Sequence, residues 1–119
     1  MAKTILIVDD EADARTTLAD ILVESGYKVV EAANGEEALE KARKEKPDLA
    51  LLDTKLPGMD GAEICRQIKQ VEKLDTKVIV YTGKIDAIDA VKARRMGADD
   101  YCGKGADTSL LIDAVKKLI

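Results

Sequence analysis

The chain has 119 residues, 46% of them hydrophobic and 35% charged, so it fits one folded domain with a hydrophobic core. This composition excludes a disordered chain, and the net charge of -4 argues against direct nucleic-acid binding. No signal peptide and no apolar run long enough to span a membrane are present, so we expect a cytoplasmic protein without membrane contact. Cys65 and Cys102 lack metal-ligand spacing, which predicts free thiols in a reducing compartment.

Apolar runs and helical periodicities alternate along the first half of the chain. A strand is predicted at Ile5–Val8, followed by a helix that ends at Gly26 and a second strand at Tyr27–Glu31. After the turn residues Asn34-Gly35, a charged helix over Glu36–Lys46 precedes Leu49–Leu52. Four consecutive apolar residues there predict a central strand that is buried on both faces.

The second half repeats this alternation. A helix after Gly61 carries Ile64, Ile68 and Val71, and a strand is predicted at Val78–Tyr81. The remaining elements are a helix from Asp86 to about Met96, a strand over Ala98–Cys102, and a last helix capped by Asp107 or Thr108.

Five strands that alternate with five helices predict an α/β fold with a parallel sheet, right-handed crossovers and helices on both faces. Five strands suit the flavodoxin-like order 2-1-3-4-5 better than the six-stranded Rossmann order. We therefore expect one doubly wound domain over residues 1–119, with no output domain in this chain.

Three carboxylates follow two strands that are neighbours in this order. Asp9 and Asp10 come after the first strand and Asp53 after the third, so all three should converge at the carboxyl edge of the sheet. Alone, Asp10 or Glu11 could simply begin the next helix, favoured by the helix dipole. Together the three carboxylates repel one another, and an oxygen-only ligand set selects a hard cation such as Mg²⁺.

Two further side chains follow the fourth and fifth strands. Thr82 offers a hydroxyl group and Lys104 a positive charge. With a metal between carboxylates, these are the groups that phosphoryl transfer to a carboxylate needs, and Asp53 is the candidate nucleophile.

Over its whole length the sequence resembles the receiver domains of bacterial two-component response regulators. The matching segments are Val8-Asp9-Asp10-Glu11, Leu52-Asp53, Leu56-Pro57-Gly58-Met59-Asp60-Gly61, Thr82-Gly83, Gly97-Ala98-Asp99-Asp100-Tyr101 and Lys104. Each segment is weak evidence alone, but together, each at a strand end and in this order, they are highly specific.

The resemblance implies a role for each site residue. Asp9 and Asp10 would hold Mg²⁺ beside Asp53, with Asp10 as the expected direct ligand and the backbone carbonyl of Lys55 as a further contact. Asp53 would accept a phosphoryl group from a histidine kinase, a phosphotransfer protein or a small acyl phosphate. Lys104 and Thr82 would hold the phosphoryl oxygens.

The resemblance also implies a switch rather than an enzyme. Thr82 would move toward the phosphoryl group, and Tyr101 would turn inward into the space it leaves. The face formed by the helix over 86–96, the strand over 98–102 and the last helix would then change its preference for a downstream protein or a fused output domain. We expect a monomer, with dimerisation on phosphorylation as an open possibility.

One residue departs from the family pattern. Gly105 stands where a proline, in a cis bond after the lysine, is usual. Since a cis bond before a non-proline residue costs roughly 2.5–4 kcal/mol, we predict a trans Lys104–Gly105 bond. This departure leaves open an alternative function as a phosphate-independent docking module. Lys55 and Lys84, two residues past Asp53 and Thr82, either aid the capture of anionic phosphodonors or are plain surface lysines.

Two other functions of the same fold fit less well. A flavin- or nucleotide-binding module needs a phosphate cradle after the first strand, where this chain has Asp9-Asp10-Glu11. An aspartyl-phosphate hydrolase of small metabolites would carry Asp-x-Asp after its first strand, whereas Asp53 is followed by Thr54-Lys55.

Overall fold

The computed structural model describes residues 3–53, 56, 59, 61–71, 73–82, 91–92, 94–103 and 108–119. The strands are β1 (Thr4–Val8), β2 (Lys28–Ala32), β3 (Leu49–Leu52), β4 (Lys77–Thr82) and β5 (Asp100–Gly103). The helices are α1 (Ala12–Glu24), α2 (Gly35–Glu45), α3 (Gly61–Arg66), its π-helical continuation η1 (Gln67–Val71) and α5 (Thr108–Leu118). Residues 91–92 and 94–95 are helical too, and the rest of the helix predicted from Asp86 lies outside the described residues.

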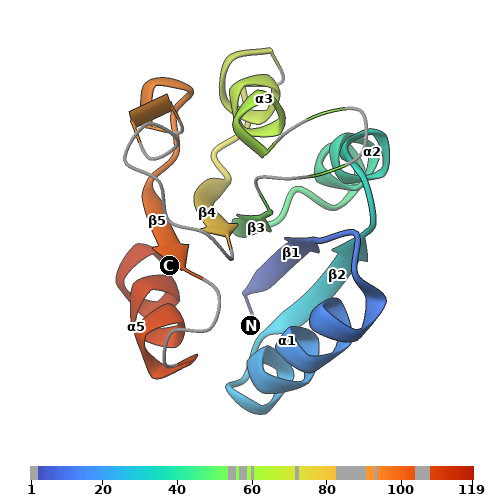
Figure 1. The fold of residues 1–119 in the computed structure, drawn as a ribbon, viewed down its shortest axis with the longest axis vertical. Coiled ribbons are helices and arrows are strands. Elements are labelled where there is room, and N and C mark those ends of the chain that lie inside the picture. Colours follow the sequence, from blue (N-terminus) through green and yellow to red (C-terminus); the bar gives the residue numbers. More distant parts are fainter. Residues whose placement is uncertain are drawn as a thin grey trace.

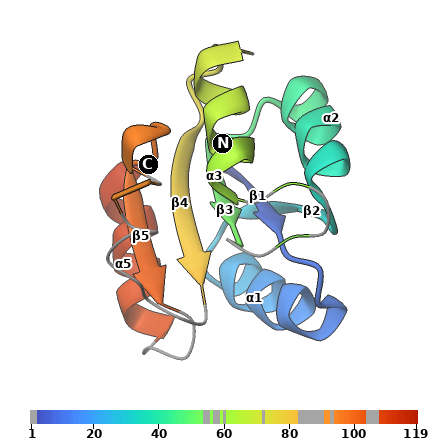
Figure 2. The ribbon, with the colours of Figure 1, turned by 45° about the horizontal axis from the view of Figure 1, so that its top comes forward.

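The five strands form one sheet in the order β2-β1-β3-β4-β5, and all neighbours are parallel, which confirms the predicted topology. Val8 at the end of β1 pairs with Leu52 at the end of β3, and Leu52 pairs with Val80 of β4. The carboxyl ends of the central strands therefore lie together at one edge of the sheet. Figure 2 shows β4 between β3 and β5.

Two hydrophobic clusters cover the two faces of this sheet. Leu6, Val8 and Leu52 belong to the cluster on the side of α2 and α3, whereas Ile7 and Leu51 belong to the cluster on the side of α1 and α5. Figure 1 shows α2 and α3 on one side of the sheet and α1 and α5 on the other. Alternate residues of a strand face opposite sides, so the continuous apolar runs fill both clusters.

The helix ends follow the local sequence. Asn34 is the N-cap of α2, and its side chain accepts a hydrogen bond from the Glu37 N–H at 2.9 Å. The predicted turn Asn34-Gly35 is therefore the start of α2. Gly26, which follows α1, has φ +97°, a conformation that glycine adopts readily.

The third helix departs from the prediction of a regular α-helix through Val71. After Arg66 the backbone widens into the π-helical turns of η1. Ile64 and Ile68 are fully buried, but Val71, the last residue of the π segment, is 56% exposed. The π segment could not be inferred from hydrophobic spacing.

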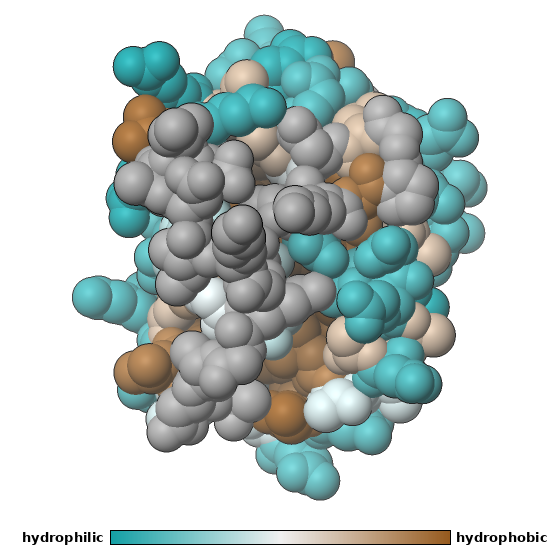
Figure 3. Space-filling model, in the orientation of Figure 1, coloured by the Kyte–Doolittle hydropathy of each residue, from teal (hydrophilic) through white to brown (hydrophobic). Residues whose placement is uncertain are grey.

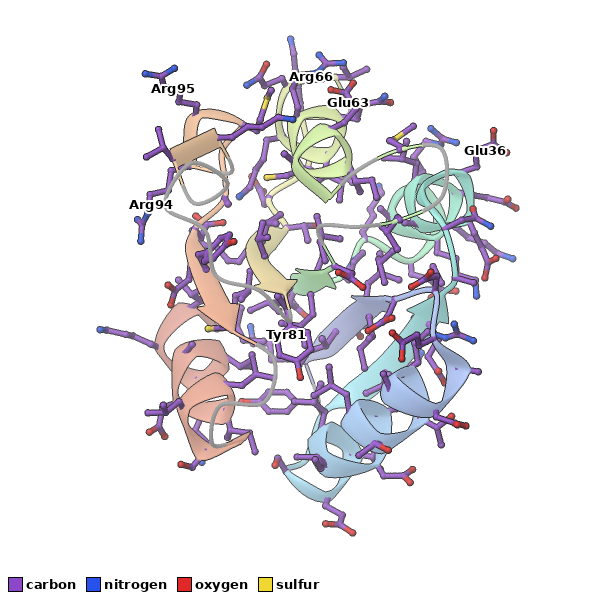
Figure 4. All side chains as sticks on the ribbon, in the orientation of Figure 1. Glu36, Glu63, Arg66, Tyr81, Arg94 and Arg95 are labelled. Carbon is purple, nitrogen blue, oxygen red and sulfur yellow. The ribbon has the colours of Figure 1, made fainter. Side chains whose placement is uncertain are left out.

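Charged residues cover much of the outer surface. Figure 4 shows Glu63 and Arg66 side by side on the outside of α3, and Arg66 Nη2 lies 2.6 Å from Glu63 Oε1. Figure 3 shows hydrophilic residues over the outer sides of α1, α2 and α3. Cys65 and Cys102 are free thiols, as predicted. They lie on opposite faces of the sheet. None of the helices in the described ranges has the length and apolar character needed to cross a membrane.

Candidate functional site

The site begins where β1 and β3 end side by side. The Asp53 N–H donates to the Val8 carbonyl oxygen at 3.0 Å, and the Asp9 N–H donates to the Ala32 carbonyl oxygen at 3.1 Å. Both residues thus continue the hydrogen bonding of the strands before them. The parallel sheet therefore fixes the backbone of two carboxylates at one edge.

The side chains of Asp9, Asp10 and Asp53 come together at this edge. One carboxylate oxygen from each residue lies within 4.8 Å of the others. Asp9 and Asp53 are only 3% and 7% exposed, whereas Asp10 is exposed. Three negative groups this close repel one another, and a cation among them would remove that repulsion. The donor set is all oxygen, which fits a hard divalent cation such as Mg²⁺ better than a thiophilic one.

Local hydrogen bonds hold the turn that carries Asp9 and Asp10. Asp9 Oδ1 accepts a hydrogen bond from the Glu11 N–H at 2.9 Å, and Arg15 Nη1 donates to the Asp9 carbonyl oxygen at 2.6 Å. Arg15 Nε also lies 3.4 Å from Glu31 Oε1 of β2. Glu11 is the N-cap of α1 and makes no side-chain capping bond. Asp10 precedes that cap, so its carboxylate does not serve as the helix start.

Sequence reasoning missed Arg15 as part of this site. The available signal was its position one turn after Glu11, which brings the side chain back over the preceding turn of α1. Its guanidinium connects β2, the Asp9 backbone and α1. Arg15 therefore fixes the loop that presents the two N-terminal carboxylates.

The predicted switch residues are described only in part. Tyr101 of β5 packs against the cluster on the α2 and α3 side, and its hydroxyl oxygen is buried. Thr82 is the last residue of β4 and pairs with Gly103, but its side chain lies outside the described part of the chain. Lys55, Lys84, Lys104 and Gly105, with the predicted trans bond, also lie outside it.

A second polar cluster, unexpected from the sequence, lies between η1 and the start of β5. Lys69 Nζ lies 2.8 Å from Asp99 Oδ2, and the same oxygen accepts the Val78 N–H at 2.8 Å. The Asp99 N–H in turn donates to the Val78 carbonyl oxygen at 2.7 Å. Burial raises the pKa of Asp99, but the hydrogen bonds from Lys69 and Val78 outweigh it, so the pKa lies below its usual value.

Comparison with known proteins agrees with this geometry. The model of the response regulator receiver domain family matches residues 5–116. The alkaline phosphatase synthesis transcriptional regulatory protein PhoP of Bacillus subtilis is 48% identical over 104 residues, which cover 87% of this chain and 43% of that protein. The chain thus spans less than half the length of PhoP.

Two further relatives match nearly end to end. The sporulation initiation phosphotransferase F of Bacillus subtilis is 40% identical over 121 residues, with 100% of this chain and 95% of that protein covered. The structure of the response regulator TrrA from Thermotoga maritima, in complex with Mg(2+)-BeF, has 38% identity and a TM-score of 0.89. That alignment covers 98% of this chain and 99% of TrrA.

Proposed function

Since the chain belongs to the response regulator receiver domain family, we propose that it is a phosphoacceptor switch whose acceptor is Asp53. The observation that carries this proposal is the convergence of the Asp9, Asp10 and Asp53 carboxylates at the carboxyl edge of the sheet. Asp53 follows the central strand β3, so its backbone is held by the sheet, and its carboxylate lies beside those of Asp9 and Asp10.

The chemical step is phosphoryl transfer to a carboxylate. An oxygen of Asp53 attacks the phosphorus of the donor and forms the new P–O bond. The bond from phosphorus to the donor breaks, and its electron pair leaves with a histidine nitrogen of a kinase or phosphotransfer protein, or with the carboxylate of a small acyl phosphate. A carboxylate nucleophile has no proton to lose when the new P–O bond forms, so this step needs no general base.

Mg²⁺ would be held by Asp9, Asp10 and Asp53, with the Lys55 carbonyl oxygen as a further ligand. The ion would supply positive charge against the phosphoryl oxygens. The protein's own contribution is to keep the carboxylates in place. Arg15 donates a hydrogen bond to the Asp9 carbonyl oxygen, and the Glu11 N–H donates one to the Asp9 carboxylate, so both hold Asp9 in place. In this proposal the Lys104 ammonium group and the Thr82 hydroxyl group hold the phosphoryl oxygens.

The proposed output is a change of the face that includes β5 and α5. Thr82 ends β4 and Tyr101 lies on β5, which pairs with β4 in parallel. Movement of Thr82 toward the phosphoryl group would therefore change the packing around Tyr101 on the neighbouring strand. The hydroxyl oxygen of Tyr101 is already buried. The consequence is a changed affinity for a downstream protein or a fused output domain, as in a two-state switch. The family membership supports a cytoplasmic protein that works with a histidine kinase.

The first experiment is incubation with Mg²⁺ and acetyl phosphate, followed by intact-mass spectrometry. The parent protein should gain one phosphoryl group, and Asp53→Asn should gain none. Asp10→Asn should be phosphorylated much more slowly. Asp20→Asn, an exposed aspartate of α1, is the matched control and should behave as the parent.

The failure of this experiment would be informative. If the folded parent gains no phosphoryl group with Mg²⁺ present, the phosphoacceptor proposal is wrong. The alternative, a docking module that works without phosphate, would then be favoured. Phosphorylation of Asp53→Asn to the same extent as the parent would instead move the acceptor to another residue.

A further inference from the structure

A cavity of about 550 Å³ lies at the opposite edge of the sheet from the carboxylate cluster. It is formed where two neighbouring helix-to-strand turns meet, the turn before β3 and the turn before β4. The Lys77 N–H donates to the Asp48 carbonyl oxygen at 3.0 Å and joins these turns. The cavity volume is in the range of sites that bind small molecules.

The charge around this cavity is opposite to that of the protein as a whole. Its lining includes four lysines, Lys3, Lys46, Lys73 and Lys77, and two aspartates, Asp48 and Asp75, together with the last residue, Ile119, so lysines outnumber acidic side chains there. The chain as a whole carries a net charge of -4. The Asp48 carboxylate already has a hydrogen-bond partner, because its Oδ2 accepts the Thr4 N–H at 2.8 Å. Four lysines around one cavity raise the local positive potential, which favours an anion there.

Two of these lysines have the left-handed backbone conformation, which glycine and asparagine adopt more readily than lysine. Lys46 has φ 46° and Lys73 has φ 53°, and they are the non-glycine residues with positive φ in the described chain. Glycine or asparagine adopts this left-handed conformation at lower cost. Lys46 is the C-cap of α2, where the helix dipole also favours a cation, and both lysines line the same cavity.

The remaining wall is apolar and well supported. Pro47, Leu74 and Leu118 line it, and the buried Thr76 hydroxyl donates to the Pro47 carbonyl oxygen at 2.7 Å. Lysine, and not arginine, supplies all the positive charge. Lysine binds phosphate as a point charge and sets no planar, two-pronged geometry on the ligand.

We propose that this cavity is a second ligand site, which binds a small molecule carrying two phosphate groups and an apolar part, of nucleotide size. The four ammonium groups would hold the phosphates, and the wall of Pro47, Leu74 and Leu118 would cover the apolar part. The site uses neither Asp53 nor a metal, so it stands or falls independently of phosphorylation.

The test is titration of the ¹⁵N-labelled protein with pyrophosphate and with ADP in the presence of EDTA. We expect saturable shifts, at millimolar or lower concentrations, of the backbone amides of Lys46, Lys73 and Lys77. ADP should bind at least as tightly as pyrophosphate because it can also cover the apolar wall. The same shifts should appear in Asp53→Asn.

The decisive variant is the double change Lys46→Asn and Lys73→Asn. Asparagine tolerates the left-handed backbone, so the fold should be kept while two charges are lost. We expect affinity for both probes to fall about tenfold or more. A control with Lys44→Gln and Lys116→Gln removes two exposed charges elsewhere and should stay within about twofold of the parent, a change that reflects only long-range charge.

Three results would overturn the proposal. The first is the absence of saturable shifts in the parent at millimolar concentrations of either probe. The second is equal weakening by the control pair, which would mean nonspecific attraction of anions. The third is binding of pyrophosphate with exclusion of ADP, which would reject a ligand of nucleotide size. Urea unfolding of each variant would confirm that the fold is intact.

Discussion

Gly35, the first residue of α2, leaves space that Met59 fills. A Cβ atom at position 35 would lie 2.9 Å from Met59 Cβ and 3.1 Å from its Sδ. We therefore expect Gly35→Ala to destabilise the fold by about 1–3 kcal/mol in urea unfolding, although alanine favours helix. Part of this loss should be recovered when Met59→Ala is added, since the Sδ contact is then gone.

Gly26 is the matched comparison, because its constraint is the backbone alone. Its φ is +97°, and a Cβ atom there would meet nothing within 4 Å. Gly26→Ala should cost about 1 kcal/mol from backbone strain, with no recovery from Met59→Ala. Equal recovery in both backgrounds would show that Met59 does not press on Gly35.

The two thiols should differ in reactivity. Burial raises the pKa of Cys65 to about 11, and burial also raises the pKa of Cys102, which is only half-buried. At pH 8 about one Cys65 in a thousand is then a thiolate. We expect iodoacetamide to label Cys102 first and Cys65 mainly after unfolding, as followed by mass spectrometry. Equal labelling rates in the native protein would contradict this.

The hydrophobic pattern predicted the strands well but missed the hydrogen bonds that polar side chains make at the strand ends. The strand predicted over Ala98–Cys102 begins at Asp100, because the Asp99 carboxylate takes the Val78 N–H that a neighbouring strand would otherwise bind. The π turn of η1 escaped prediction because Ile64 and Ile68 fit a regular α-helix equally well. A contact such as Lys69 to Asp99 joins residues far apart in sequence, and no local pattern indicates it.

The Lys69–Asp99 pair should contribute a pH-dependent share of stability. Lys69→Met keeps the stem that packs over Gly97 but removes the charge. We expect a loss of about 0.5–1 kcal/mol at pH 7, because the pair is partly exposed. Since the folded state lowers the pKa of Asp99, the pair's contribution is present above the unfolded pKa and is lost as pH falls through the folded value.

The difference between parent and Lys69→Met should accordingly shrink below about pH 4, as measured by urea unfolding at several pH values. Lys44→Met, at an exposed position of α2, is the control and should show little effect at any pH. A difference that stays constant from pH 7 to pH 3 would mean that Lys69 does not stabilise the fold through the Asp99 carboxylate.

Across the whole molecule, strand order is what made the carboxylate cluster predictable. Asp9 and Asp53 are far apart in sequence, but parallel pairing of β1 with β3 leaves only one edge for both. Arg15 was less predictable, because its position one turn after Glu11 places its side chain over the start of α1 but does not single out the Asp9 carbonyl oxygen as its acceptor. The cavity at the other edge depends on two turns meeting in space, so no local pattern indicates it beyond isolated lysines.

Without a bound cation, the carboxylate cluster should lower the free energy of unfolding, because three carboxylates lie close together at the ends of the central strands. Asp10→Asn removes one of these charges without burying an amide, since Asp10 is exposed. In EDTA we expect this variant to be more stable than the parent by about 0.5–1 kcal/mol in urea unfolding. Asp20→Asn should leave stability nearly unchanged.

Addition of Mg²⁺ should reverse that order. A ligand present at ten times its dissociation constant stabilises the folded state by about 1.4 kcal/mol, so the parent should gain this amount while Asp10→Asn gains much less. Asp20→Asn should respond as the parent does. If all three proteins respond equally to Mg²⁺, the ion acts by general screening and the cluster does not bind it. If Mg²⁺ stabilises only the proteins that keep Asp10, the ion binds the cluster and offsets the repulsion among its three carboxylates.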